Sequence, residues 1–376
     1  VGCPNTGIRE RFLERVDKLL DRRWYTNNGE FVQELEERLA HHLNVKHCIA
    51  TCNGTIALEI TIRALKLTGE VIVPSFTFVA TAHALQWQEI TPVFCDIEPV
   101  NHLIDANRVE SMITPRTTGI IGVHTWGRAC DVEMLTEIAE RRNLTLIFDA
   151  AHAFGCSHGD AMIGTFGSAE VFSFHATKFF NTFEGGAVAT NDDALAEKIR
   201  FMKNFRFGGY DQVDHVGTNG KMTEICAAMG LTGLVSLDYF IEVNRQNYLT
   251  YKEGLHGIPG VRLLEYELNE KRNFQYITLE IDPEEAGITR DALCEFLHSQ
   301  NVLARRYFYP GCHRMEPYRS YFPHSGLMLK NTERVCERVM ALPTGTAMSR
   351  DRIEIICSLI ANAVGDPVHV RRRLSA

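Results

Sequence analysis

Lys178 has the most distinctive chemical setting of any residue in this chain. It follows the segment Phe172–Phe174, precedes Phe179 and Phe180, and stands shortly before the glycine-rich turn Glu184–Gly186. An apolar environment disfavours the ammonium form, so it lowers the pKa of the amine and favours Schiff-base formation. Most lysines are solvated surface residues, so the prediction of a nucleophilic lysine depends on further groups nearby.

An acidic residue closes a second apolar run. Asp149 follows Thr145–Phe148, and an acid at the end of a buried strand is costly unless it has a partner. A pyridinium nitrogen is one such partner, because the carboxylate keeps it protonated and the ring can then accept electrons. From position alone, an Asp that caps the next helix or pairs with a buried base fits equally well.

A third pattern, Asn53-Gly54-Thr55, lies between a predicted strand and a predicted helix. Gly54 allows close backbone approach, and the amides at a helix N-terminus bind phosphate. The same triplet more often forms a plain turn with an N-cap. An amine, an acid and a phosphate loop at strand ends are nevertheless the groups that one molecule of pyridoxal phosphate (PLP) needs.

The elements that position these groups alternate between short apolar runs and amphipathic stretches. This alternation predicts an α/β fold with a largely parallel sheet covered by helices on both faces, and ligands at the carboxyl ends of the strands. Predicted helices span Thr55–Leu67 and Asp131–Arg142. Predicted strands are His47–Thr51, Glu70–Val73, Thr91–Asp96, Gly119–His124, Thr145–Asp149, Glu170–Phe174 and Gly186–Thr190.

The pattern changes after about Leu237. A long polar helix, Leu237–Leu255, leads to a predicted strand at Gln275–Ile281 and a predicted helix at Arg290–Gln300. We therefore expect two domains, a large one over residues 1–245 and a small C-terminal one over residues 246–376.

Several separated motifs resemble the DegT/DnrJ/EryC1/StrS family of PLP-dependent nucleotide-sugar aminotransferases. They are Phe172–Lys178, which reads Phe-Ser-Phe-His-Ala-Thr-Lys, Glu184–Gly186, and Asp149–His152, which reads Asp-Ala-Ala-His. The similarity runs from Asn27–Gly29 to Pro343–Thr344. It implies the aspartate-aminotransferase-like fold (PLP fold type I), in which a large domain with a mixed, mostly parallel sheet is joined to a smaller C-terminal α+β domain.

The resemblance also implies roles for individual residues. Lys178 carries PLP covalently and moves a proton, and Asp149 holds the pyridine nitrogen. His175 lines the site as a third catalytic candidate, although a structural histidine is the alternative. The other implied cofactor contacts are Gly54, Thr55 and Ser173 at the phosphate, Phe78 and Ala151 on the two ring faces, His152 beside them, and Asn219, which reaches the phosphate of the neighbouring subunit.

The implied substrates are L-glutamate as amino donor and a nucleotide-diphosphate keto sugar, and a contribution from Asn219 implies a homodimer with shared active sites. Arg206 and Lys221 are candidates for the diphosphate, and Glu224 for a substrate-side or supporting group. Ordinary surface charge is the alternative for the two cations. Arg306, Tyr307 and Tyr309 come from Arg305–Pro310, the segment that lies near the sugar in this family, and an edge strand with aromatic packing is the alternative there.

The segments Val123–Arg128 and Arg306–Pro310 resemble enzymes that aminate carbon 4 of dTDP-4-keto-6-deoxyglucose. Amination of a 3-keto sugar stays open. A PLP-dependent sugar dehydratase is the nearest rival, but such relatives replace the Schiff-base lysine with histidine, and Lys178 is present. No Gly-x-Gly-x-x-Gly follows a strand, which argues against a nicotinamide-dependent oxidoreductase. A non-catalytic sensor would be expected to have lost Lys178 or Asp149.

Composition excludes several other classes. The net charge of −8 and the lack of a basic arm argue against nucleic-acid binding, and no apolar run reaches the length of a membrane span. The eleven cysteines form no Cys-x-x-Cys pair, and the fifteen histidines lack zinc-site spacing. We therefore expect a cytoplasmic enzyme with reduced cysteines and no metal.

Overall fold

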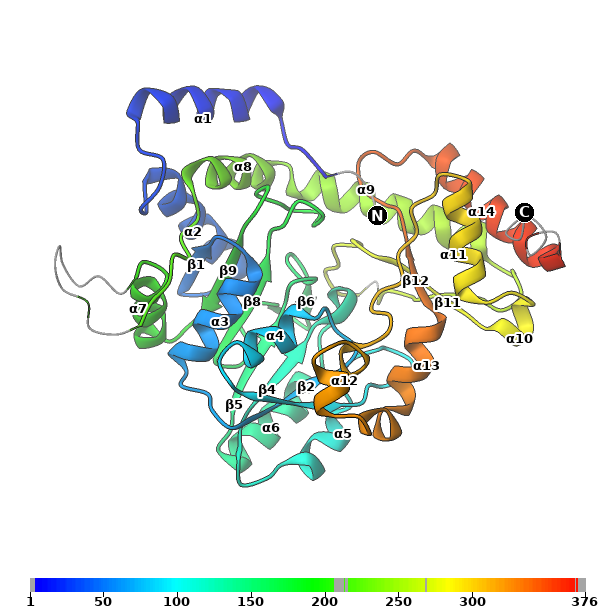
Figure 1. The fold of residues 1–376 in the computed structure, drawn as a ribbon. Coiled ribbons are helices and arrows are strands. Elements are labelled where there is room, and N and C mark those ends of the chain that lie inside the picture. The colour runs from blue at the N-terminus through cyan, green and yellow to red at the C-terminus, as the bar shows by residue number, and fades with distance from the viewer. Residues whose placement is uncertain (1–3, 206–212, 214–215, 268, 369, 371–376) are drawn as a thin grey trace.

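A seven-stranded sheet forms the centre of the larger part of the chain (Figure 1). The computed structural model describes residues 4–205, 213, 216–267, 269–368 and 370. The strand order is β1-β9-β8-β5-β4-β2-β3. The pairs from β8 to β3 are parallel, and β9 pairs antiparallel with both β1 and β8. The sheet is therefore mixed and mostly parallel, as predicted.

The strand bounds agree with the predicted ones to within two residues. They are β1 (His47–Thr51), β2 (Glu70–Pro74), β3 (Thr91–Cys95), β4 (Thr117–Val123), β5 (Thr145–Asp149), β8 (Ala169–Ser173) and β9 (Gly186–Thr190). Nearly all of their residues are buried, because helices cover both faces of the sheet.

Alternate residues of each strand enter different hydrophobic clusters. On β5, Ile147 packs with α3 (Gly54–Ala64), α4 (Ala80–Gln86) and α7 (Asp193–Met202), whereas Leu146 and Phe148 pack toward α6 (Val132–Arg142). On β8, Val171 faces the α3 side and Phe172 the opposite side. Helices α2 (Glu30–Leu43) and α8 (Glu224–Val235) cover that opposite side, and α1 (Arg9–Arg22) lies outside them against α8 (Figure 1).

A second, three-stranded antiparallel sheet lies in the C-terminal part. It contains β10 (Val261–Leu263), β11 (Ile277–Ile281) and β12 (Val339–Leu342), in the order β10-β11-β12. Helices α9 (Leu237–Leu255), α11 (Arg290–Ser299) and α14 (Arg350–Gly365) supply most of its core. The predicted long helix therefore joins the two sheets, and its second half belongs to the smaller core.

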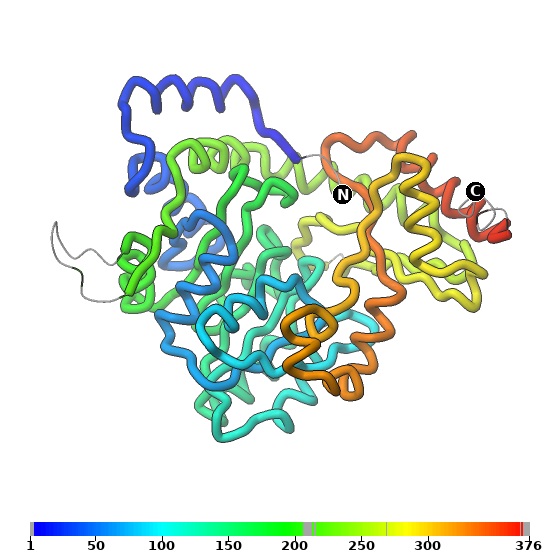
Figure 2. The backbone as a smooth tube through the Cα atoms, viewed as in Figure 1, coloured from blue at the N-terminus to red at the C-terminus, as the bar shows by residue number. Residues whose placement is uncertain are grey.

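The C-terminal part does not pack as one block. Between α11 and α13 (Lys330–Arg338), the chain returns to the large sheet, where Cys312, Tyr318 and Leu329 join the cluster that contains α3 and α4. Figure 2 shows this orange segment beside the blue and cyan trace of α4 and β3. The domain boundary near residue 245 stays a prediction.

The shorter elements are α5 (Ala106–Val109), β6 (Ser157–His158), β7 (Ala161–Met162), α10 (Pro283–Ala286) and α12 (Tyr318–Tyr321).

Among the described residues, no single helix has the length and apolar composition of a membrane span. Helices α8 and α9, bent by 64° at the break between them, meet that criterion only as a pair.

Candidate active site

A cavity of about 540 Å³ opens at the carboxyl ends of β5 and β8. Its floor comes from the large sheet, and residues from the C-terminal part, among them Tyr276 and Phe308, close one side. Ten of the residues singled out from the sequence line it. They are Gly54, Thr55, Phe78, Asp149, Ala151, His152, Ser173, His175, Lys178 and Tyr307.

Lys178 projects into this cavity from the turn that follows β8. Its amide donates to the carbonyl of His175, which folds the chain back directly after the strand. The ammonium nitrogen Nζ lies 3.2 Å from Tyr276 Oη. Burial lowers the pKa of Lys178 to about 8, and the negative charge of Asp149 opposes this shift. The amine is therefore much more often neutral near pH 7 than an ordinary lysine.

Asp149 ends β5 and is 6% exposed. Its carboxylate accepts hydrogen bonds from Thr81 Oγ1 at 2.7 Å and from the Ala151 amide at 3.1 Å. Burial raises its pKa, while these hydrogen bonds and the charge of Lys178 oppose that effect. In the described part of the chain, neither carboxylate oxygen has an ion-pair partner, so a protonated ring nitrogen would supply the missing cation.

One end of the cavity lies at the N-terminus of α3. The Asn53 side chain caps the helix by accepting from the Ile56 amide at 2.8 Å. A Cβ atom on Gly54 would lie 3.1 Å from the Ser173 Cβ, so only glycine keeps this approach uncrowded. The amides of the first helical turn and the Ser173 hydroxyl are the kind of donors that hold a phosphate, so the lining of the cavity would fit PLP at its ring nitrogen, aldehyde and phosphate.

His152 and aromatic side chains form one wall. His152 Nδ1 accepts from the Trp126 amide at 3.3 Å, and its ring is stacked 5.7 Å from Phe308 at 13° between the planes. Burial lowers the pKa of His152 well below its ordinary value, so the ring is neutral. Phe78, which is 57% exposed, stands at the mouth.

His175 lies at the rim of the cavity and is largely solvent-exposed. Its Nδ1 accepts from the Thr177 amide at 3.2 Å, and its Nε2 lies 3.4 Å from Glu184 Oε1. These local contacts fit a histidine with a purely structural role as well as one that acts in the active site. A catalytic role for His175 stays a prediction.

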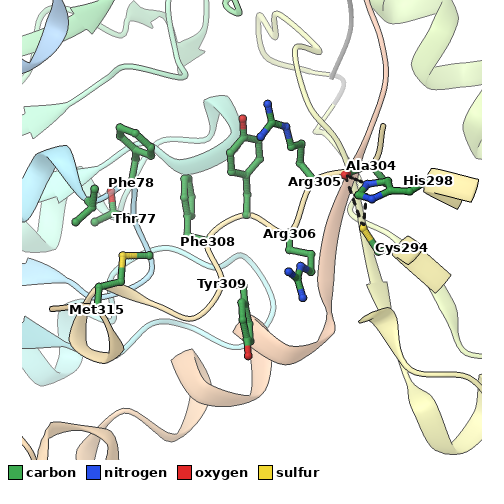
Figure 3. A pocket seen from close by; sticks show the side chains of 12 residues that line it. Thr77, Phe78, Cys294, His298, Ala304, Arg305, Arg306, Phe308, Tyr309 and Met315 are labelled. Atoms are coloured by element: carbon green, nitrogen blue, oxygen red, sulfur yellow. Dashed lines mark hydrogen bonds between the residues drawn. The ribbon is translucent and has the colours of Figure 1, made fainter. Parts of the chain in front are cut away.

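The structure places Arg306 and Tyr309 away from this cavity. Arg305, Tyr307 and Phe308 line this cavity, whereas Arg306 and Tyr309 do not, and all five residues border an adjoining cavity. Arg306 instead pairs with Asp291 at 3.1 Å and lies over the Tyr309 ring. Figure 3 shows Arg306 and Tyr309 in the adjoining cavity of about 390 Å³, toward α11. A contact of Arg306 or Tyr309 with the substrate stays a prediction.

Glu224 is also absent from the cavity. It is 2% exposed, and its carboxylate accepts from the amides of Phe31 at 2.8 Å and Val32 at 3.3 Å. These are otherwise unsatisfied donors at the N-terminus of α2. The structure thus gives Glu224 a helix-capping role rather than a substrate-side one.

The remaining predicted residues come from the segment before α8. Asn219 is exposed, and its backbone bridges to Asn204. Lys221 Nζ lies 4.8 Å from the centre of the Phe205 ring, outside the cavity of its own chain. Arg206 lies outside the described residues. A contact of Asn219 with a neighbouring subunit stays a prediction.

Sequence reasoning missed Tyr276, because nothing near it in the sequence marks it except that it precedes a strand of the second sheet. Arg305 and Phe308 belong to the segment expected near the sugar, but they were not singled out within it. The arginine and tyrosine content of that segment is the signal that could have found Arg305. Within the described chain, no group of three or more His, Cys, Asp or Glu residues is arranged to hold a metal ion, and the ten described cysteines are free.

The chain is similar to known proteins along most of its length. The profile of the DegT/DnrJ/EryC1/StrS aminotransferase family matches residues 6–361. The dTDP-4-amino-4,6-dideoxy-D-glucose transaminase of Shigella dysenteriae is 37% identical, over 95% of this chain and 96% of its own. The GDP-perosamine synthase of Vibrio cholerae is 31% identical, over 92% and 94%. The crystal structure of DesI in the presence of its TDP-sugar product has a TM-score of 0.94 and 46% identity, over 99% of this chain and 95% of that one.

Proposed function

Because this chain belongs to the DegT/DnrJ/EryC1/StrS aminotransferase family, we propose that it uses PLP to transfer an amino group from L-glutamate to carbon 4 of dTDP-4-keto-6-deoxyglucose. The product is the 4-amino-4,6-dideoxy sugar. The observation that carries the proposal is that one cavity contains Lys178, whose pKa is lowered, Asp149, which is buried without an ion-pair partner among the described residues, and the N-terminus of α3. The names of the relatives from Shigella dysenteriae and of DesI support the choice of a TDP-linked substrate.

Different residues of the cavity hold different parts of the cofactor. Bound there, PLP supplies an electron sink for the removal of a proton from the carbon that carries nitrogen. Lys178 Nζ holds the group covalently, and Asp149 keeps a proton on the ring nitrogen. Gly54, Thr55 and Ser173 bind the phosphate. His152, Ala151 and Phe78 border the ring.

Lys178 also moves the proton during transfer. A group with a pKa of about 8 exchanges protons in both directions near neutral pH, whereas an amine at 10.5 would remain protonated. Tyr276 keeps the amine turned into the cavity through its contact at 3.2 Å. Because burial raises the pKa of Tyr276 well above 10, its phenol stays neutral.

The nucleotide diphosphate needs a local cation, because the net charge of the chain is −8. Arg305 is exposed and lines the cavity, and within the described chain it has no carboxylate partner. Arg306, by contrast, is paired with Asp291. We therefore assign the diphosphate to Arg305 and sugar hydroxyls to Tyr307, in place of the contacts expected from Arg306 and Tyr309.

The proposed enzyme is a cytoplasmic homodimer. Asn219 lies exposed outside the cavity of its own chain, where a symmetry-related copy could receive it. In a shared site, Asn219 binds the phosphate of the neighbouring subunit. The ten cysteines that the structure describes are all free thiols, and a reducing compartment such as the cytoplasm keeps thiols in this state.

The test is turnover of a panel of 3-keto and 4-keto nucleotide sugars with nitrogen-15-labelled glutamate. NMR of the product locates the nitrogen. Label at carbon 4 of the dTDP sugar supports the proposal. Label at carbon 3, or turnover only of another nucleotide's sugar, rejects the substrate but leaves the aminotransferase activity. Loss of a sugar hydroxyl without nitrogen incorporation would favour the dehydratase alternative.

A further inference from the structure

Trp126 links the active-site cavity to the second sheet. It follows β4, is fully buried, and has φ 61°, a left-handed conformation that large L-residues rarely adopt. Its backbone N–H donates to His152 Nδ1, and its indole Nε1–H donates to His102 Nδ1, both at 3.3 Å. One residue therefore holds two histidines through two different donors.

The backbone bond determines where His152 carries its proton. A ring nitrogen that accepts a hydrogen bond bears no proton, so the neutral ring must carry its proton on Nε2. His152 lines the cavity, and Nδ1 is turned to Trp126. The polar atom left for a bound molecule is thus a donor, Nε2–H.

The indole bond ties this arrangement to the small sheet. His102 is 1% exposed, and its Nε2 lies 3.9 Å from Glu280 on β11. Glu280 in turn pairs with Arg262 and Arg334. A neutral His102 that accepts at Nδ1 carries its proton on Nε2, the nitrogen on the Glu280 side, where no described atom accepts a hydrogen bond from it.

We propose that Trp126 is a positioning residue that fixes His152 in the Nε2–H tautomer, so that the site presents a hydrogen-bond donor to an anionic oxygen of the bound cofactor. The inference rests on the proposed function only in placing PLP in this cavity. The His102 bond and the packing of the indole against Phe308, at 12° between the planes, keep the left-handed backbone in place. Without the indole N–H, the amide of residue 126 drifts from Nδ1, and the other tautomer becomes accessible.

The first experiment reads the tautomer directly. Long-range proton–nitrogen-15 NMR of the full chain labelled at histidine, with and without PLP, distinguishes the two ring nitrogens, and a His152→Gln variant assigns the signal. We expect the Nε2–H form to persist without protonation from pH 8 to about pH 6. An Nδ1–H tautomer, or titration at the ordinary value, would overturn the proposal whatever reaction the enzyme catalyses.

The second experiment removes the indole donor alone. Trp126→Phe keeps an aromatic ring, and we expect mixed His152 tautomers and a dissociation constant for PLP roughly five- to tenfold higher, the effect of one hydrogen bond. Trp87→Phe is the matched control, because Trp87 is 79% exposed, and it should change neither reading. If Trp126→Phe does not fold, His102→Gly removes the acceptor of the same bond and suits the left-handed backbone at residue 102.

A double-mutant comparison separates positioning from general stability. Glutamine has an amide donor and no tautomers, so in a His152→Gln background the Trp126→Phe change should add little to the loss of PLP affinity. Fully additive losses would contradict positioning through His152. Additive losses would reject the positioning role of Trp126 but would not change the result of the product assay, so the proposed function and this inference can fail independently.

Discussion

Lys178 Nζ lies 3.2 Å from the phenolic oxygen of Tyr276, a residue 98 positions later in the chain. Lys178 follows a strand of the large sheet, and Tyr276 directly precedes β11 of the small one. Their contact therefore joins the two parts of the chain at the reacting centre. It also buries the amine, which is the main cause of its lowered pKa.

This burial predicts the pH dependence of cofactor capture by the apoenzyme. With a pKa of about 8, about one Lys178 in ten is neutral at pH 7, against about one in three thousand for an amine at 10.5. Since the neutral amine is the nucleophile, the capture rate should rise with pH up to about 8 and then level off. Stopped-flow absorbance with PLP measures it, and a rate still rising steeply at pH 10 would contradict the burial of Lys178.

Asp149→Asn should retain bound PLP but lose about a hundredfold or more in kcat. An amide cannot hold the ring nitrogen protonated, whereas most of the cavity is unchanged. Steady-state turnover and cofactor absorbance give the two readings. Asp131→Asn is the matched control, because Asp131 caps α6 at the surface and Asn caps equally well. Activity of Asp149→Asn within a few-fold of the parent would assign the role to another residue.

The sheet could be predicted closely because each strand is a short apolar run bounded by turn residues. Strands β1, β5 and β9 have the predicted bounds, and their ends place Asp149 and the segment before Lys178 at one edge. Helix α9 likewise spans the predicted Leu237–Leu255. Local sequence patterns were sufficient to predict the position of a functional group wherever that group directly follows a short apolar strand.

Contacts that depend on packing between distant segments could not be predicted in this way. Tyr276 enters the site only because the small sheet docks on the large one. Glu224 was expected as a substrate-side or supporting group, and the structure shows that its carboxylate caps the N-terminus of α2. The segment that contains Arg305 does lie at the cavity, but which of its side chains line the cavity depends on the turn over residues 307–310, which the local sequence pattern does not give.

Arg305→Gln should raise the KM for the nucleotide sugar roughly tenfold, because the diphosphate loses a charge-assisted hydrogen bond. The half-reaction with glutamate, which involves no nucleotide, should be unchanged. Arg306→Gln, one residue further on and already paired with Asp291, is the matched control and should leave this KM nearly unaltered. Equal effects of both changes, or a larger effect at Arg306, would refute the assignment of the diphosphate to Arg305.

Asn219 should act in trans. Lys178→Ala subunits mixed with Asn219→Ala subunits should regain activity on subunit exchange, since one site of each mixed dimer then combines Lys178 of one chain with Asn219 of the other. The test requires that Asn219→Ala alone weakens PLP retention severely. Mixed dimers that form, as shown by differential tagging, without activity above that of the separate variants would exclude a shared site.

The covalent link at Lys178 tests the central claim most directly. The holoenzyme is reduced with borohydride, digested, and mapped by mass spectrometry, with Lys178→Ala treated in parallel. We predict a single pyridoxyl group on the peptide that contains Lys178, and neither label nor turnover in the variant. A pyridoxyl group on any other lysine, or full activity of Lys178→Ala, would contradict the account.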